Sequence, residues 1–269
     1  ASAEYIRSYE KFFSAKLTIS KDNKIVDSTG DSVLIRQTLR VNTVLTSLHL
    51  VETNIGYIEI CLIAEGLKAN KSLVELNLKR NKVDDDGILI LLSALEKNNS
   101  LTRLDLSENR INGQGGIHIS RALRLNTSLT LLDLSYNNIG TTGAVPIGEA
   151  LRTNNFLTSL NLSYNKIGET GAAPIGEALR TNTSLILLNL SSNKIGDTTA
   201  AFIGKALSTN TSISALNLSN NNIGATGVVP IGAALKYNLS LTSIDLSDNN
   251  ITNELSTLLY VSSSKIIIT

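Results

Sequence analysis

A leucine or isoleucine recurs every 28 residues along most of the chain, at Leu45, Leu73, Leu101, Leu129, Leu157, Leu185, Ile213 and Leu241. We call this residue position 0 of each unit. Further apolar residues follow at positions +3 and +5, such as Leu132 and Leu134 in the fourth unit. This alternation is typical of a short, half-buried β-strand. The pattern therefore predicts one strand in each of eight units.

An asparagine follows the predicted strand at position +8 in every unit but the first. These residues are Asn81, Asn109, Asn137, Asn165, Asn193, Asn221 and Asn249. A short amide side chain can bond to backbone groups that a turn leaves unpaired. The recurrence favours a structural role, and stacked units would align these residues into an asparagine ladder.

The second half of each unit has the apolar spacing of a helix, for example in residues 143–154. Position +17 is occupied by proline in three units, at Pro146, Pro174 and Pro230. Proline is tolerated near the first turn, so we expect the helices to begin close to these prolines. Basic residues at +23, such as Arg124 and Arg152, are expected to lie near the helix ends and to pair with Glu149 or Glu177.

The unit Leu-x-x-Leu-x-Leu-x-x-Asn-x-Ile-Gly, followed by an Ala-Leu helix, resembles the ribonuclease-inhibitor-like class of leucine-rich repeats over residues 45–252. The resemblance implies an α/β solenoid shaped like a horseshoe, with a concave parallel β-sheet and convex α-helices. Residues 1–44 are then expected to form an N-terminal cap, a helix plus a degenerate repeat that retains Ile35, Leu39 and Asn42. Residues 253–269 are expected to form a partial repeat or cap, with one more strand beginning near Ile266.

Composition narrows the classes of partner. A net charge of +1 argues against a dedicated nucleic-acid binder, and against an inhibitor that captures a basic ribonuclease. No apolar run approaches the roughly 20 residues of a membrane-spanning helix. Cys61 is the sole cysteine of the sequence, which favours a reducing compartment. We therefore expect a cytoplasmic monomer, in the host cytosol if the chain is a delivered bacterial effector.

Residues that could support catalysis do not form a recognisable motif. His49 and His118 stand alone in the sequence, and we expect His49 to form hydrogen bonds on a polar face rather than to bind a metal. Asn-x-Ser/Thr triplets, such as residues 126–128 and 182–184, recur with the repeat and need no glycosylation to explain them. The sequence thus predicts a protein that is not an enzyme and holds no cofactor or metal.

Function is expected at positions that the repeat leaves free, namely +2 and +4 on the strand and +7 and +9 beyond it. Apolar and aromatic residues gather in the middle units, with charged residues earlier. The predicted partner-binding residues are Glu75, Arg103, Glu108, Leu131, Tyr136, Tyr164 and Leu187. Tyr136 and Tyr164 should be neighbours, either as anchors for a partner or merely stacked on each other. Cations at +9 could face an acidic partner or form a solvated edge; they are Lys82, Arg110, Lys166 and Lys194.

These residues favour a protein-interaction scaffold that binds a folded protein on its concave face. Two alternatives remain open at this point. The resembling family includes GTPase-activating proteins, which would imply stimulation of a small GTPase, although no catalytic motif of that family matches here residue by residue. The chain could also be a ligand-sensing or autoinhibitory segment of a larger receptor or bacterial effector.

Overall fold

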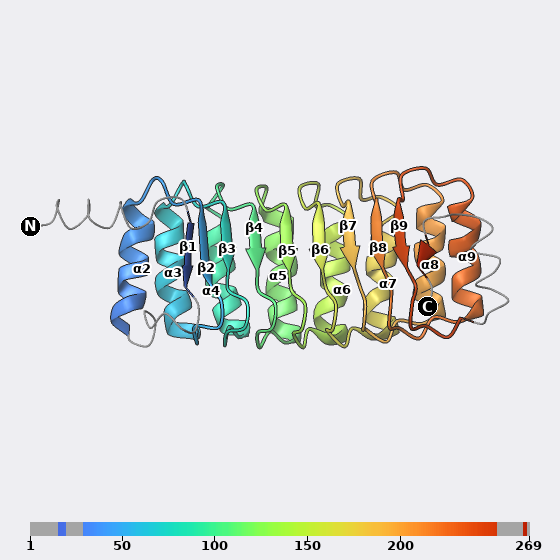
Figure 1. Cartoon of the computed structure of the whole chain (residues 1–269), viewed down its shortest axis with the longest axis horizontal. Coiled ribbons are helices and arrows are strands. Elements are labelled where there is room, and N and C mark those ends of the chain that lie inside the picture. Colours follow the sequence, from blue (N-terminus) through green and yellow to red (C-terminus); the bar gives the residue numbers. More distant parts are fainter. Residues whose placement is uncertain (1–15, 20–28, 252–265, 268–269) are drawn as a thin grey trace, which may run out of the picture.

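The computed structural model describes residues 16–19, 29–251 and 266–267, in which strands and helices alternate (Figure 1). The strands are β1 (Lys16–Ile19), β2 (Ser47–Leu50), β3 (Glu75–Asn77), β4 (Arg103–Asp105), β5 (Leu131–Asp133), β6 (Ser159–Asn161), β7 (Leu187–Asn189), β8 (Ala215–Asn217), β9 (Ser243–Asp245) and β10 (Ile266–Ile267). The helices are α2 (Thr29–Val41), α3 (Tyr57–Ala69), α4 (Asp85–Leu95), α5 (Gly113–Leu125), α6 (Gly140–Leu151), α7 (Gly168–Ala178), α8 (Asp197–Leu207) and α9 (Ala225–Leu235).

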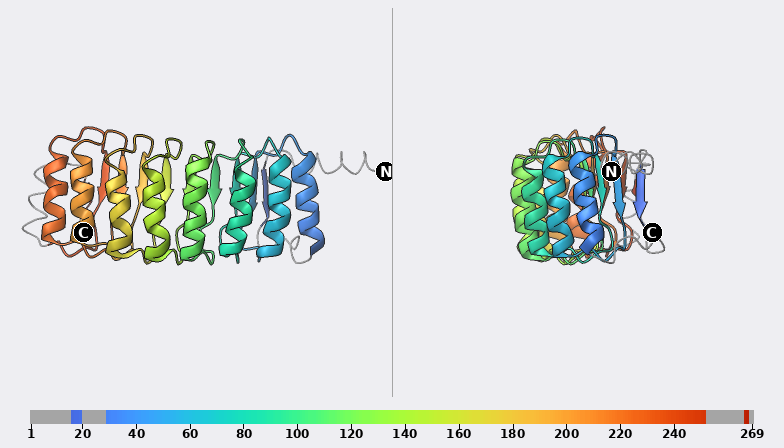
Figure 2. Two further views of the ribbon diagram at one scale, coloured as in Figure 1. Left: turned by 180° about the vertical axis from the view of Figure 1, so that it is seen from behind. Right: turned by 90° about the vertical axis from the view of Figure 1, so that its left-hand side faces the viewer.

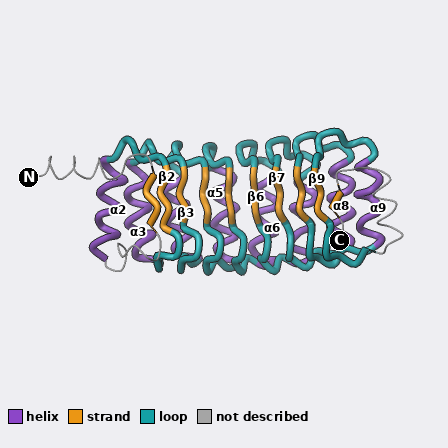
Figure 3. Tube along the Cα trace, viewed as in Figure 1, coloured by secondary structure: helices purple, strands orange, loops and turns teal. Residues whose placement is uncertain are grey.

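All strands of the described residues join one parallel sheet in the order of the sequence (Figure 3). Each strand from β2 to β9 pairs with the next in the register of the 28-residue repeat, so that Leu132 lies opposite Leu160. At the C-terminal end β10 places Ile266 opposite Ile244, which confirms the extra strand. At the other end Leu17 pairs with Leu48, so β1 and β2 are further apart in sequence than one repeat.

The sheet forms one layer and the helices form the other (Figures 1 and 2). Seen end-on, the central helices lie further out than those at both ends, so the array curves toward its sheet (Figure 2). The predicted leucine-rich-repeat solenoid is therefore confirmed. The helix expected at the start of the N-terminal cap and residues 253–265 of the expected C-terminal partial repeat or cap lie outside the described residues.

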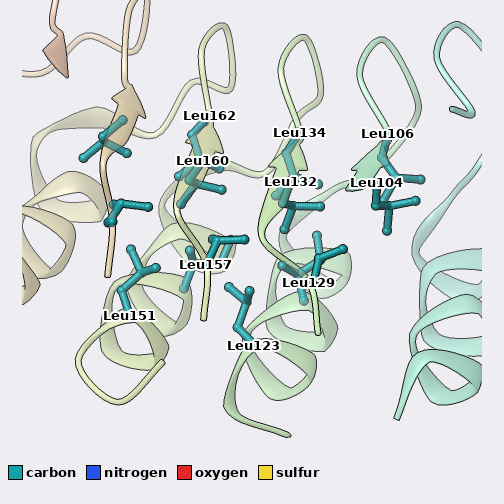
Figure 4. Packing of buried hydrophobic residues seen from close by; sticks show 14 of the residues in the cluster. Leu104, Leu106, Leu123, Leu129, Leu132, Leu134, Leu151, Leu157, Leu160 and Leu162 are labelled. Carbon is teal, nitrogen blue, oxygen red and sulfur yellow. The ribbon is translucent and has the colours of Figure 1, made fainter. Parts of the chain in front are cut away.

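The core lies between the two layers and repeats with each unit. Leucines at positions 0, +3 and +5 point from the strand side toward the helices, as Leu157, Leu160 and Leu162 do in Figure 4, and all three are buried. Burying one such side chain contributes about 1.5–3 kcal/mol. Ile35 and Leu39 before the first full repeat are buried as well, as the degenerate unit predicts.

The helices begin earlier than the prolines predict. Helix α6 starts at Gly140 and α7 at Gly168, so Pro146 and Pro174 lie inside these helices rather than near their first residues. The expected helix starts therefore lay too far along the chain. Gly148 of α6 lies so close to α7 that a Cβ atom there would be 2.8 Å from Pro174 Cβ and 2.6 Å from Ile175 N.

The predicted asparagine ladder is present and fully bonded. Asn193 is buried, and its Nδ2 donates to the Leu162 and Leu190 carbonyls at 2.8 and 3.1 Å. Its Oδ1 accepts from the backbone N–H groups of Asn165 and Ile167 at 3.0 and 3.3 Å. Each asparagine therefore satisfies backbone groups in its own repeat and in the preceding one.

A second asparagine ladder at position +25 was missed in the sequence, at Asn70, Asn98, Asn126, Asn154, Asn182, Asn210 and Asn238. Asn182 donates to the Leu151 and Asn154 carbonyls at 2.7 and 2.9 Å, and accepts from Leu185 N–H at 2.8 Å. The signal lay in the Asn-x-Ser triplets of residues 126–128 and 182–184. Their asparagines are buried structural groups, as their recurrence with the repeat suggested.

Carboxylates at the start of one helix bond to the start of the next. Asp197 Oδ1 accepts from Gly224 N–H at 2.6 Å, and its Oδ2 accepts from the Thr226 hydroxyl. The hydrogen bond from Thr226 and those from the Gly224 and Gly227 N–H groups lower the pKa of Asp197, against the smaller raising effect of burial. Glu169 caps α8 in the same way through Thr199 N–H at 2.8 Å. Consecutive repeats are thus joined at the helix side as well.

Candidate protein-binding surface

An open hollow of about 440 Å³ lies on the sheet face across β5 to β9. Its apolar part is formed at position +2, where the register places Leu131 and Leu187 on either side of Ser159. The small Ser159 leaves space between the two leucines, and Leu187 is 45% exposed. The structure thus brings these two predicted residues into one depression, which continues over Ala215 and Ser243.

Position +7 forms a row of side-chain pairs just beyond the strands. Arg80 Nε donates to Glu108 Oε2 at 2.6 Å, and Asn220 Nδ2 donates to Ser192 Oγ at 2.9 Å. Between these pairs, Tyr136 and Tyr164 stack with ring centroids 4.1 Å apart and an interplanar angle of 9°. All six residues have left-handed backbone conformations with φ between 52 and 57°. This geometry is costly for tyrosine but well tolerated by asparagine.

The tyrosine pair is both stacked and accessible. Tyr136 and Tyr164 are 51% and 43% exposed. A hydrogen bond with Tyr164 raises the pKa of Tyr136, whereas hydrogen bonds with Ser192 and then Tyr136 lower the pKa of Tyr164. Stacking on each other, one of the two alternatives from the sequence, is observed, and both residues remain exposed to solvent.

The charged candidates lie on the N-terminal side of the hollow. Glu75 Oε1 is 3.0 Å from His49 Nε2, which is the polar contact expected for that histidine. Glu108 also pairs with Lys79 at 3.1 Å; burial acts to raise its pKa, but the hydrogen bonds and charges of Arg80 and Lys79 together lower it. Arg103 is exposed on β4 opposite Leu131, with no ion pair in the described chain. None of the three lines the hollow.

Position +4 is less free than the sequence indicated. Asp133 Oδ1 accepts from Ser135 N–H and Oγ at 2.8 and 2.6 Å, and Oδ2 accepts from Asn161 Nδ2 at 3.0 Å. In each strand from β3 to β9, the side chain at position +4 accepts a hydrogen bond from the backbone N–H two residues further along the chain. Burial, and secondarily the charge of Asp133, raise the pKa of Asp105 against the Ser107 hydrogen bonds.

The cations at +9 are exposed, and Lys166 Nζ donates to Asn138 Oδ1 at 2.9 Å. Over the part of the chain described here, no group of three or more His, Cys, Asp or Glu side chains is placed to hold a metal ion. No helix within residues 29–251 is both long enough and apolar enough to cross a membrane.

The family model described as "Leucine Rich repeat" matches residues 69–91, 97–120, 125–148, 153–176, 181–203, 209–232 and 237–254. The chain therefore belongs to the leucine-rich-repeat family, whose members typically serve as non-enzymatic binding scaffolds. A search of curated proteins gives no match.

Solved structures share the fold at low sequence identity. Internalin C2 from Listeria monocytogenes is 20% identical and has a TM-score of 0.53, covering 94% of this chain and 99% of its own. The leiomodin-1 actin-binding site 2 is 24% identical with a TM-score of 0.47, covering 52% of this chain and 80% of its own. The leucine-rich-repeat domain of APL1 is 17% identical with a TM-score of 0.48, and the match covers 81% of this chain and 53% of the APL1 chain. At these identities the likeness concerns the fold.

Proposed function

We propose that this chain is a protein-interaction scaffold of the ribonuclease-inhibitor-like class that binds a protein partner on its concave sheet face. The observation that carries the proposal is the placement of Leu131, Leu187, Tyr136 and Tyr164 on neighbouring strands and turns, with three of the four at least 43% exposed. Interface energy concentrates in a few apolar and aromatic anchors surrounded by polar groups. Glu75, Arg103 and Glu108 supply the polar rim on one side and complete the proposed partner-binding set.

The repeat supports a surface of sufficient size. A standard interface involves about 20–30 residues per side, which the +2, +4, +7 and +9 positions of eight units supply. We take the protein to be a monomer in a reducing compartment such as the cytosol. The single cysteine of the sequence, Cys61, agrees with that placement.

The other repeats provide substitutions that test the surface without disturbing the fold. Leu131 and Leu187 are changed to serine, which Ser159 and Ser243 already place at +2. Tyr136 and Tyr164 are changed to asparagine, which Asn220 already places at +7 and which accepts positive φ. We expect the quadruple variant to keep the unfolding midpoint of the wild type, because none of the four side chains is buried in the core.

Affinity capture from a lysate then compares this concave variant with the wild type and with a convex control, Leu89→Ser/Val229→Ser, whose two side chains are exposed on α4 and α9. The proposal expects a protein that the wild type and the convex control retain and the concave variant loses. Equal retention by the concave variant, or loss by the convex control alone, would refute the proposed binding face.

A further inference from the structure

The charged side chains that line the hollow are all acidic. Its lining spans β5 to β9 and includes Asp133 near one end and Asp245 at the other, without a lysine or arginine among its residues. Asp248 is exposed just beyond β9 and adds negative charge at the same end. Beside the +4 row that holds the two carboxylates, the +2 row contributes the apolar surfaces of Leu131, Leu187 and Ala215. The hollow is therefore apolar along its +2 row and has a carboxylate at each end of its +4 row.

The surroundings restrict where a positively charged segment could lie. Lys166 and Lys194 are exposed beyond the strands of β6 and β7, and Arg103 is exposed on β4. Lys166 and Lys194 act against a basic segment at the turn edge, and Arg103 acts against one placed directly over its side chain on β4. A complementary segment therefore crosses the middle of the strands, from β5 to β9.

We infer that the part of the partner bound here is a basic–apolar–basic segment, with an apolar side chain seated over Ser159 between Leu131 and Leu187 and a lysine or arginine reaching each of Asp133 and Asp245. This inference rests on the proposed function and adds the chemistry of the partner. The two carboxylates are four strands apart, which corresponds to about 19 Å at about 4.8 Å per strand. The two basic residues are then separated by about six positions in an extended segment, or about 13 in a helix.

The repeats supply a conservative test of the charge. Asparagine occupies +4 at Asn161, Asn189 and Asn217, where it accepts the same backbone hydrogen bond as aspartate does. The variant Asp133→Asn/Asp245→Asn therefore removes two charges and keeps the hydrogen bonds from the backbone N–H groups of Ser135 and Ser247, while the bond from Asn161 Nδ2 to residue 133 is lost. A charge-matched control, Asp86→Asn/Glu149→Gln, changes two exposed residues on the helix side.

The probe is a library of random 16-residue peptides displayed on phage and selected on the wild-type protein. We expect the selected sequences to contain a large apolar residue flanked by lysine or arginine. The most enriched peptide is then synthesised, and its dissociation constant is measured by fluorescence anisotropy at low and high salt. The Asp133→Asn/Asp245→Asn variant should bind it about tenfold more weakly at low salt, with little remaining salt dependence, while the charge-matched control binds as the wild type does.

The outcomes separate the inference from the proposed function. Selected peptides that need Leu131 and Leu187 but lack flanking basic residues, or that bind the double asparagine variant with unchanged affinity, overturn the inference and leave the proposed function standing. Selected peptides that bind Leu131→Ser/Leu187→Ser as tightly as the wild type, or a library that yields no peptide dependent on these leucines, overturn both.

Discussion

Replacing Asn193 with alanine removes the side chain that joins two consecutive repeats at the turn ladder. The backbone N–H groups of Asn165 and Ile167 lose the amide oxygen to which they donate at 3.0 and 3.3 Å. Asn193 is fully buried, so water does not replace this acceptor without a rearrangement. Each buried N–H left unpaired costs about 1–3 kcal/mol, so we expect a loss of about 2–6 kcal/mol in the free energy of unfolding.

The loss is measured by urea unfolding followed by circular dichroism, with Asn155→Ala as the control. Asn155 is exposed, and its replacement should change the free energy of unfolding by less than about 0.5 kcal/mol. A cost below about 1 kcal/mol for Asn193→Ala, with an unchanged denaturant slope, would contradict the view that the ladder satisfies otherwise unpaired backbone groups. Amide hydrogen exchange should also accelerate at Asn165 and Ile167 in particular.

Three further predictions concern the helix side. Gly148→Ala should lower the thermal unfolding midpoint, because its Cβ would lie 2.6 Å from Ile175 N. The control Gly176→Ala has its nearest contact at 3.1 Å, to a side-chain carbon, and should keep or raise the midpoint. Equal changes in the midpoint for the two variants would contradict the close approach at Gly148. The Asp197 carboxylate should stabilise the folded state above about pH 4, and this contribution should be lost as the pH falls through its lowered folded-state pKa. We therefore expect Asp197→Asn to lower the free energy of unfolding at neutral pH, and the values of wild type and variant to become equal in acid. Arg152→Ala should lower the free energy of unfolding by less than about 1 kcal/mol, and by less in high salt, because its ion pair with Glu177 at 2.5 Å is exposed. A larger loss of this free energy in urea titrations would indicate a structural role for the pair.

The repeat period of the sequence was enough to predict most of the fold. Because Leu132 and Leu160 occupy the same position of successive units, the strand register followed from spacing alone. The asparagine ladder at Asn193 was predictable for the same reason. The start of α6 at Gly140 was not predicted, because Pro146 was expected to lie close to the first residue of the helix.

From the sequence, the candidate site could be predicted only as a set of residues that lie side by side in adjacent repeats. Repeat spacing placed Tyr136 next to Tyr164, but it could not show that Glu108 is paired with Arg80, since that depends on side-chain conformation. The ion pairs between helices were expected, and the structure has Arg124 with Glu149 in the next repeat at 3.3 Å. The hollow itself depends on the small size of Ser159 between two leucines, which becomes visible only once the strands are side by side.

The central claim is that a partner binds the sheet face around Leu131 and Leu187. Methyl NMR of leucine- and valine-labelled protein, titrated with the selected peptide, tests it most directly. We expect the largest shift changes at the Leu131 and Leu187 methyl groups, with none at Leu89 and Val229, which are exposed on α4 and α9. Changes confined to Leu89 and Val229, with Leu131 and Leu187 unmoved at saturation, would contradict the account.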